Sequence, residues 1–147
     1  MTDTPGILQL LAFAAEPGGG NPAGVVLDAT SLDDAEMQRI AADLGHPETA
    51  FVTARAGNSV AVRYFSPDAE VPFCGHATIA TAVALTEIDG AGGYVFDTAA
   101  GAVEGVTERD AEGAVVAGFT SVEPYVIDLE PEVADRLLAL MGLTRDD

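Results

Sequence analysis

The stretch from Ala77 to Ile88 restricts the fold of this chain more than any other segment. It is built from Ala, Thr, Ile, Val and Leu and carries no charge before Glu87. A helix that is apolar on all sides has no face suited to water, so it has to be covered on every side. The chain has 147 residues, enough for one domain with a substantial core. We therefore expect the other segments to wrap around this helix.

The flanking segments have the patterns of strands and amphipathic helices. Between Ser59 and Phe65, successive side chains alternate between two faces, as in a strand. A helix over 32–44 has Ser31 as its predicted N-cap and Gly45 as its end. We predict further strands at 7–14, 23–27, 49–53, 94–98, 102–107 and 114–119, and a last helix at 132–141. The predicted fold class is α+β: one domain, 1–147, with a curved mixed or antiparallel sheet around a central buried helix.

The charge of the chain is strongly one-sided. It has 24 acidic residues against six arginines and no lysine, for a net charge of -18. Such a surface repels nucleic acid and anionic membranes, so neither is expected as a partner. Two origins stay open: a GC-rich genome, or adaptation to high salt, where acidic self-repulsion is screened. The size of the imbalance favours high salt.

The sequence also gives expectations about location. No apolar run approaches the roughly 20 residues that a membrane span needs. No basic flank precedes the first apolar segment, so no secretory signal is expected. The predicted location is the cytoplasm.

Spacing rules argue against several common sites. Cys74 is the single cysteine, so the chain has no internal disulfide, and together with His46 and His76 it follows no zinc-ligand spacing; no metal site is predicted. Residues 18–23 satisfy the pattern G-x-G-x-x-A but lead into a strand, whereas a dinucleotide loop opens a helix. No G-x-S-x-G elbow occurs, so a serine hydrolase is not expected.

The turn Cys74-Gly75-His76 opens the buried helix and is the first candidate site. A glycine there lets backbone N–H groups approach a ligand, and a helix N-terminus favours an anion such as a carboxylate. His76 can contribute a proton or a hydrogen bond, and Cys74 can be a thiolate with a lowered pKa. The alternative is a buried small thiol beside a helix-capping histidine.

Glu48 precedes an apolar strand and is the second candidate. A glutamate at a strand mouth against apolar groups can have a raised pKa and act as a base. The alternative is an ordinary solvated loop residue.

Five segments follow one another at characteristic spacing: residues 20–26 (GNPAGVV), 37–41 (MQRIA), 48–52 (ETAFV), 63–67 (RYFSP) and 70–78 (EVPFCGHAT). In order and spacing they resemble one known family, the phenazine-biosynthesis (PhzF-like) isomerases, which share their fold with diaminopimelate epimerase. The resemblance implies a protein of two similar halves, each a sheet around a central helix, with the active site in the cleft between them. It implies no metal, flavin or pyridoxal cofactor.

The resemblance also implies roles for single residues. Glu48 is placed as the acid/base that moves a proton between carbons of a small acid. Gly75 and His76 are placed at the substrate carboxylate, with His76 also near the transferred proton, and Asn21 and Ala77 join the predicted substrate-binding set. Cys74 occupies the position of one catalytic thiol of the epimerases.

The chain departs from the family pattern in one large respect. The family's second half carries an Asp and a Gly-Ser turn that complete the site, and nothing here matches them. Four explanations stay open: a separately encoded partner, pairing of two copies, a fragment, or a gene remnant. We expect a homodimer, or a heteromer with a separately encoded second half.

The sequence therefore predicts a cofactor-independent isomerase or epimerase acting on a small carboxylate-bearing metabolite. Two rivals remain. One is a catalytically silent carboxylate-binding or assembly subunit. The other, more distant, is a thiol-dependent enzyme that uses Cys74 and His76 as a pair.

Overall fold

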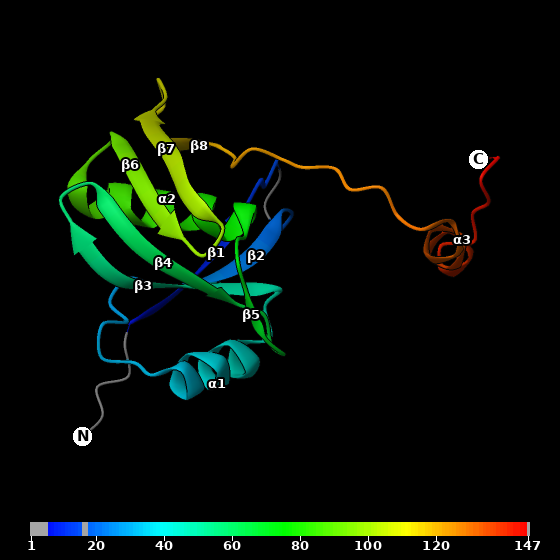
Figure 1. Cartoon of the computed structure of the whole chain (residues 1–147). Coiled ribbons are helices and arrows are strands. Elements are labelled where there is room, and N and C mark those ends of the chain that lie inside the picture. Colours follow the sequence, from blue (N-terminus) through cyan, green and yellow to red (C-terminus); the bar gives the residue numbers. More distant parts are fainter. Residues whose placement is uncertain (1–5, 16–17, 147) are drawn as a thin grey trace.

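The computed structural model describes residues 6–15 and 18–146, in which a sheet curls around one helix (Figure 1). The elements are, in chain order, β1 (Ile7–Ala12), β2 (Asn21–Val26), α1 (Asp34–Leu44), β3 (Glu48–Ala56), β4 (Ser59–Phe65), β5 (Glu70–Val71), α2 (Gly75–Asp89), β6 (Gly93–Thr98), β7 (Gly101–Arg109), β8 (Val115–Thr120) and α3 (Pro131–Leu140). The predicted α+β class, with a curved sheet around a central helix, is confirmed.

The sheet is mixed. Its strands follow the order β1-β2-β3-β4-β6-β7-β8, and β5 pairs with β4. The pairs β2–β3 and β4–β6 are parallel, and the other neighbours are antiparallel. Parallel neighbours need a crossover connection, and α1 and α2 supply the two that occur here.

The central helix α2 is enclosed by the sheet along most of its length. Its buried threonines bond back to the preceding turn: the hydroxyls of Thr78, Thr81 and Thr86 each donate to the carbonyl oxygen four residues earlier, at 2.7 to 2.8 Å. A buried hydroxyl costs little once it is hydrogen-bonded, so α2 tolerates these threonines inside the core.

The start of α1 corrects the sequence prediction. Asp33, and not Ser31, is the N-cap, and the helix begins at Asp34. The carboxylate of Asp33 accepts the N–H of Glu36 at 2.8 Å, and Glu36 accepts the N–H of Asp33 at 2.9 Å. This reciprocal capping box satisfies two amides that a serine two residues earlier cannot reach. The predicted end at Gly45, in the left-handed conformation with φ of 65°, is confirmed.

Two strand predictions also need correction. β1 ends at Ala12 and not at residue 14, because Phe13 adopts a left-handed φ of 58° that no strand continues. β5 lies in a segment predicted as loop, since its two residues are too few for a periodic pattern.

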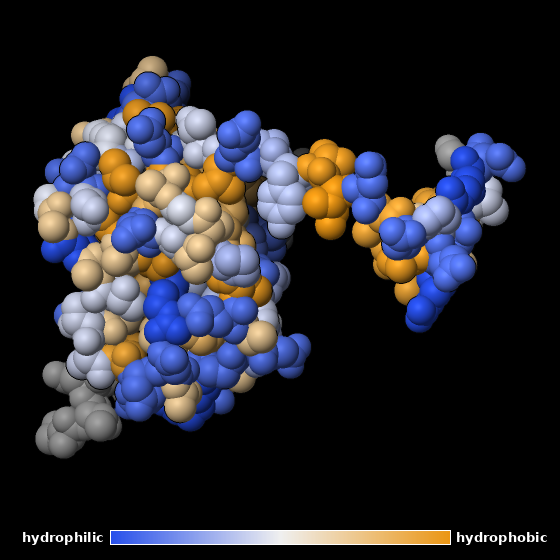
Figure 2. Space-filling model, viewed as in Figure 1, coloured by the Kyte–Doolittle hydropathy of each residue, from blue (hydrophilic) through white to orange (hydrophobic). Residues whose placement is uncertain are grey.

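The chain after β8 leaves the sheet. Residues 121–130 run without regular structure to α3, which spans Pro131–Leu140, one residue earlier at each end than the predicted 132–141 (Figure 1). All residues of α3 are described, and none of them is buried. Figure 2 shows apolar surface on this connection and on α3. The exposed large hydrophobic residues there include Tyr125, Val126, Ile127 and Leu140.

Candidate active site

Glu48 lies where β3 begins, and a close approach of two strands holds it there. Ala23 of β2 is its register partner, and Gly24 pairs with Thr49. A Cβ atom on Gly24 would lie 2.7 Å from Oγ1 of Thr49 and 2.9 Å from Cδ1 of Leu44. A larger residue at this position would force its neighbours to shift. The close packing of β3 against β2 therefore depends on Gly24, and so does the position of Glu48.

The turn at the start of α2 is held by two contacts. Cys74 is the N-cap, with extended backbone, and its carbonyl oxygen accepts the hydroxyl of Thr78 at 2.7 Å. A Cβ on Gly75 would lie 3.1 Å from Cζ of Phe119 of β8, which is tighter than ordinary packing. Gly75 therefore has a packing reason to be glycine besides the predicted access to a ligand.

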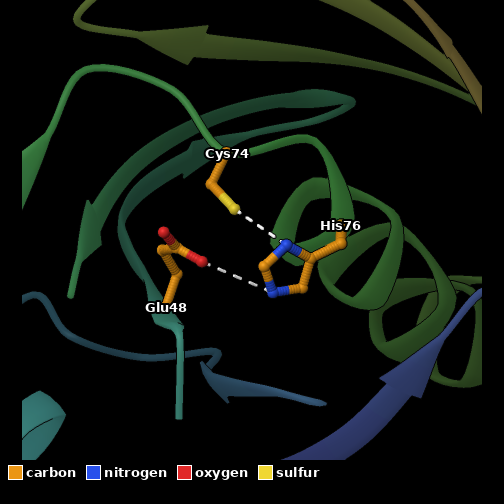
Figure 3. Close-up of side chains that lie close together, drawn as sticks. All are labelled: Glu48, Cys74 and His76. Atoms are coloured by element: carbon orange, nitrogen blue, oxygen red, sulfur yellow. Dashed lines mark hydrogen bonds and ion pairs between the residues drawn. The ribbon is translucent and has the colours of Figure 1, made fainter. Parts of the chain in front are cut away.

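The structure brings Glu48, Cys74 and His76 together, as Figure 3 shows. Sγ of Cys74 lies 3.2 Å from Nδ1 of His76, and Oε2 of Glu48 lies 3.6 Å from Nε2 of the same ring. Nε2 also lies 3.2 Å from the carbonyl oxygen of Pro22. The ring of His76 thus lies between the thiol and the carboxylate.

The neighbours of His76 assign its neutral tautomer. Nε2 faces two acceptors, the carbonyl of Pro22 and the carboxylate of Glu48, so it carries the proton and donates. Nδ1 then has a free lone pair and accepts the S–H of Cys74. The sequence alone gave Pro22 no predicted role. The one indication of its importance was its position in the segment 20–26.

The pKa of Cys74 corrects a sequence prediction. Burial raises the pKa of the thiol to about 11, and the nearby carboxylate of Glu48 adds to the rise. The backbone amides of Ala77 and His76 act in the opposite direction but are outweighed. Cys74 is therefore a thiol at neutral pH and not the predicted thiolate with a lowered pKa.

Exposure differs across the cluster. The side chain of His76 is 9% exposed and that of Glu48 is 24% exposed, so Glu48 reaches the surface of the chain. The first N–H groups of a helix have no partner within it, and α2 begins beside this carboxylate. The arrangement offers a carboxylate base, a protonated thiol and a helix N-terminus that favours an anion.

The remaining predicted site residues lie close in sequence to the cluster. Gly75 and Ala77 belong to the first turn of α2. Asn21 begins β2, one residue before Pro22. His46 is not part of the cluster: its Nε2 lies 2.8 Å from Oε1 of Gln9.

The three side chains of the cluster also include the ligand types of a metal site. One carboxylate oxygen, Sγ and a ring nitrogen all lie within 4.8 Å of one another. Sequence spacing could not indicate this set, because Glu48 comes from a different element than Cys74 and His76.

Comparisons with known proteins point to one group. A family model described as phenazine biosynthesis-like protein matches residues 10–145. The uncharacterized isomerase YddE of Escherichia coli O157:H7 is 37% identical over 97% of this chain and 49% of its own length. Among solved structures, a PhzF family protein from Bacillus anthracis matches with a TM-score of 0.68 and 36% identity over 76% of this chain and 38% of that one. A predicted epimerase from Pseudomonas aeruginosa, PA4716, matches with a TM-score of 0.71 and 29% identity over 77% and 41%.

The coverage of these matches is itself a finding. The chain spans about half the length of the curated relatives it matches, although the matches cover nearly all of this chain.

Within the described residues, no helix combines the length and apolar character needed to cross a bilayer.

Proposed function

Since this chain belongs to the phenazine biosynthesis-like protein family, whose matched relatives are named isomerases, we propose that it forms the N-terminal half of a cofactor-independent isomerase or epimerase. The substrate is a small carboxylate-bearing metabolite, and the reaction is transfer of a carbon-bound proton. One observation carries the proposal: the carboxylate of Glu48 faces the ring of His76, beside the protonated thiol of Cys74, at the N-terminus of a buried helix.

Each group has a role in this scheme. Glu48 takes the proton from carbon, because it is the one carboxylate of the cluster and reaches the surface. The substrate carboxylate binds at the N-terminal turn of α2, which Gly75 begins and where the helix dipole stabilises negative charge. Charge that develops as the proton leaves is stabilised by the same fixed dipoles. Asn21, next to Pro22 at the start of β2, is proposed as a further substrate contact.

His76 and Cys74 form the second part of the scheme. The Nε2–H of His76 donates to the carbonyl of Pro22 and lies 3.6 Å from Glu48, so a substrate oxygen bound beside Glu48 can share it as a hydrogen-bond donor. Cys74, with its pKa of about 11, keeps its proton at neutral pH and therefore acts as an acid and not as a resting thiolate.

The proposed proton transfer requires a second protein surface that closes the site. Glu48 is partly open to solvent, and proton abstraction from carbon needs a site that excludes water. A half-length match to the relatives and the exposed apolar side chains on 121–130 and α3 support a partner: a separately encoded second half, or a second copy of this chain.

The test is exchange of solvent deuterium into candidate carboxylic acids, followed by mass spectrometry, with any partner chain present. Glu48→Gln keeps the size and removes the base, so we expect exchange to fall by at least about 100-fold. Glu87→Gln makes the same change on the exposed side of α2 and is expected to exchange at the unaltered rate. Equal exchange in both variants would remove Glu48 from the mechanism.

A silent carboxylate-binding subunit is the second candidate, favoured by the half-length match alone. It predicts that carboxylic acids protect the chain against thermal unfolding while no deuterium enters carbon, whichever partner is added. Protection that is equal in Glu48→Gln and in the unaltered protein fits this candidate, because the binding amides belong to α2.

A further inference from the structure

We propose that Glu48, Cys74 and His76 bind one thiophilic divalent cation, of the Zn²⁺ or Cd²⁺ class, which blocks the candidate active site. The three residues supply a carboxylate oxygen, a sulfur and an imidazole nitrogen within 4.8 Å of one another. This mixed set suits Zn²⁺ and Cd²⁺ and disfavours Mg²⁺ and Ca²⁺, which prefer oxygen ligands.

The position of the ring favours Nδ1 of His76 as the ligand nitrogen. Its other nitrogen, Nε2, donates to the carbonyl of Pro22, and such a hydrogen bond fixes the tautomer and orientation of a metal-binding histidine. The lone pair of Nδ1 then faces Sγ of Cys74 at 3.2 Å. Two ligands at ordinary zinc distances in a tetrahedron lie about 3.5 Å apart, so a small rotation of the thiol suffices.

Glu48 completes a three-ligand site. Oε2 of Glu48 lies 3.6 Å from Nε2, so its partly exposed side chain turns to bring one oxygen toward Sγ and Nδ1 when the ion binds. A fourth, open position is left for water, as in zinc sites with three protein ligands. One thiolate and one carboxylate balance the two positive charges of the ion, so the bound site is neutral. Burial of Cys74 and His76 favours such a neutral assembly over separate charges.

Binding of the ion replaces the S–H bond of Cys74 by a metal–sulfur bond. The ion forms a bond to sulfur, and the S–H proton of Cys74 leaves to solvent; no oxidant or reductant takes part. The bound ion blocks the reaction because it engages both the carboxylate of Glu48 and the sulfur of Cys74. This inhibition rests on the proposed function. The binding itself does not depend on that function.

The experiment is titration of the metal-free protein with Cd²⁺ in a large excess of Mg²⁺, which occupies the many exposed carboxylates. We expect one Cd²⁺ per chain and an ultraviolet thiolate-to-cadmium charge-transfer band. His76→Gln and Glu48→Gln each remove a ligand and are expected to weaken binding at least about tenfold, since the loss of a group that merely orients a metal ligand already has an effect of this size. Cys74→Ser should remove the band, and His46→Gln, which changes a histidine outside the cluster, should bind as the unaltered protein does.

The outcomes separate the two proposals. A missing charge-transfer band, or equal affinity in His76→Gln and the unaltered protein, overturns the metal site. Cd²⁺ binding with the expected variant pattern in a protein that never exchanges carbon-bound deuterium keeps the metal site and removes the isomerase. Deuterium exchange that persists at saturating Cd²⁺ overturns the blocking role.

Discussion

The phenolic oxygen of Tyr64 on β4 lies 2.7 Å from Oγ1 of Thr78 on α2. Oγ1 of Thr78 already donates to the carbonyl of Cys74, so Tyr64 is the donor of the shared bond. Both side chains are buried, and burial raises the pKa of Tyr64 well above its usual range. This chain of hydrogen bonds ties the sheet to the residue that begins the candidate site.

A double-mutant cycle tests this link. Tyr64→Phe leaves Thr78 bonded to Cys74 and is expected to cost about 1 kcal/mol of unfolding free energy. Thr78→Val leaves the Tyr64 hydroxyl buried without a partner and is expected to cost more, about 2 to 3 kcal/mol. Urea unfolding of both variants and the double variant measures this. The double variant should cost less than the sum, because no unpaired hydroxyl remains; simple additivity would contradict the link.

Thr49 offers a stabilising substitution. Among the described residues, its Oγ1 is the buried side-chain polar atom that lacks a hydrogen-bond partner. On the side of Gly24 even a Cβ atom would lie only 2.7 Å from this oxygen, so no water fits on that side. Thr49→Val replaces the hydroxyl by a methyl group of similar size, so we expect unfolding to cost about 1 kcal/mol more.

Thr107→Val is the matched control for that substitution. Its Oγ1 lies at hydrogen-bonding distance, 2.7 Å, from Oγ1 of Thr86 and accepts the N–H of Gly92 at 3.1 Å. Losing these bonds should destabilise the protein in the same thermal melts. If Thr49→Val lowers the midpoint of thermal unfolding as Thr107→Val does, the hydroxyl of Thr49 is not an unpaired group.

Arg63 makes the free energy of unfolding depend on pH in the acidic range. Its guanidinium bonds Asp34 of α1 at 2.6 Å and Glu70 of β5 at 2.7 Å. These bonds hold the pKa of both carboxyls below their usual values. A folded-state pKa below the unfolded one gives stability at pH values above the unfolded pKa, and this is lost as pH falls through the lowered pKa.

Arg63→Met should therefore reduce stability at neutral pH and flatten the acid limb of the curve of unfolding free energy against pH. The effect is modest, because both carboxylates are substantially exposed. Arg39→Met, which breaks a pair within α1 at the surface, is the control. Parallel acid limbs for Arg63→Met and the unaltered protein would show that the two carboxylates carry no acid sensitivity.

Cys74 should react slowly with alkylating agents. The thiolate is the reactive form, and with a pKa near 11 only a minute fraction is present at neutral pH. The rate of iodoacetamide labelling, followed by intact mass, is expected to rise about tenfold per pH unit up to that pKa. Glu48→Gln removes one cause of the raised pKa and should speed labelling. Rapid labelling at pH 7 would instead support the thiol-dependent rival.

The net charge of -18 predicts a dependence on salt. If the acidic surface reflects adaptation to high salt, the melting temperature should rise steeply with KCl, because the ions screen self-repulsion among carboxylates. Melting curves at several KCl concentrations measure this. A midpoint that is independent of KCl would favour the compositional origin.

Much of the fold was predictable because it follows from local pattern. The uncharged stretch after Ala77 predicted a buried helix, and the alternation from Ser59 to Phe65 predicted a strand with the observed bounds. The capping box of Asp33 and Glu36 was visible in the sequence as D-x-x-E and was overlooked in favour of Ser31. β5 could not be predicted, since its two residues are too few to show an alternation, although their partners on β4 are near in the chain.

The sequence by itself determined which residues can carry chemistry: a carboxylate before a strand, and a thiol and an imidazole two residues apart at the start of an apolar helix. Only the tertiary structure decided that Glu48 lies 3.6 Å from His76, because strand pairing and helix packing bring together segments distant in the chain. It also decided the protonation of Cys74. A pKa depends on burial and on neighbouring charge, and neither exists until the sheet has closed around the helix.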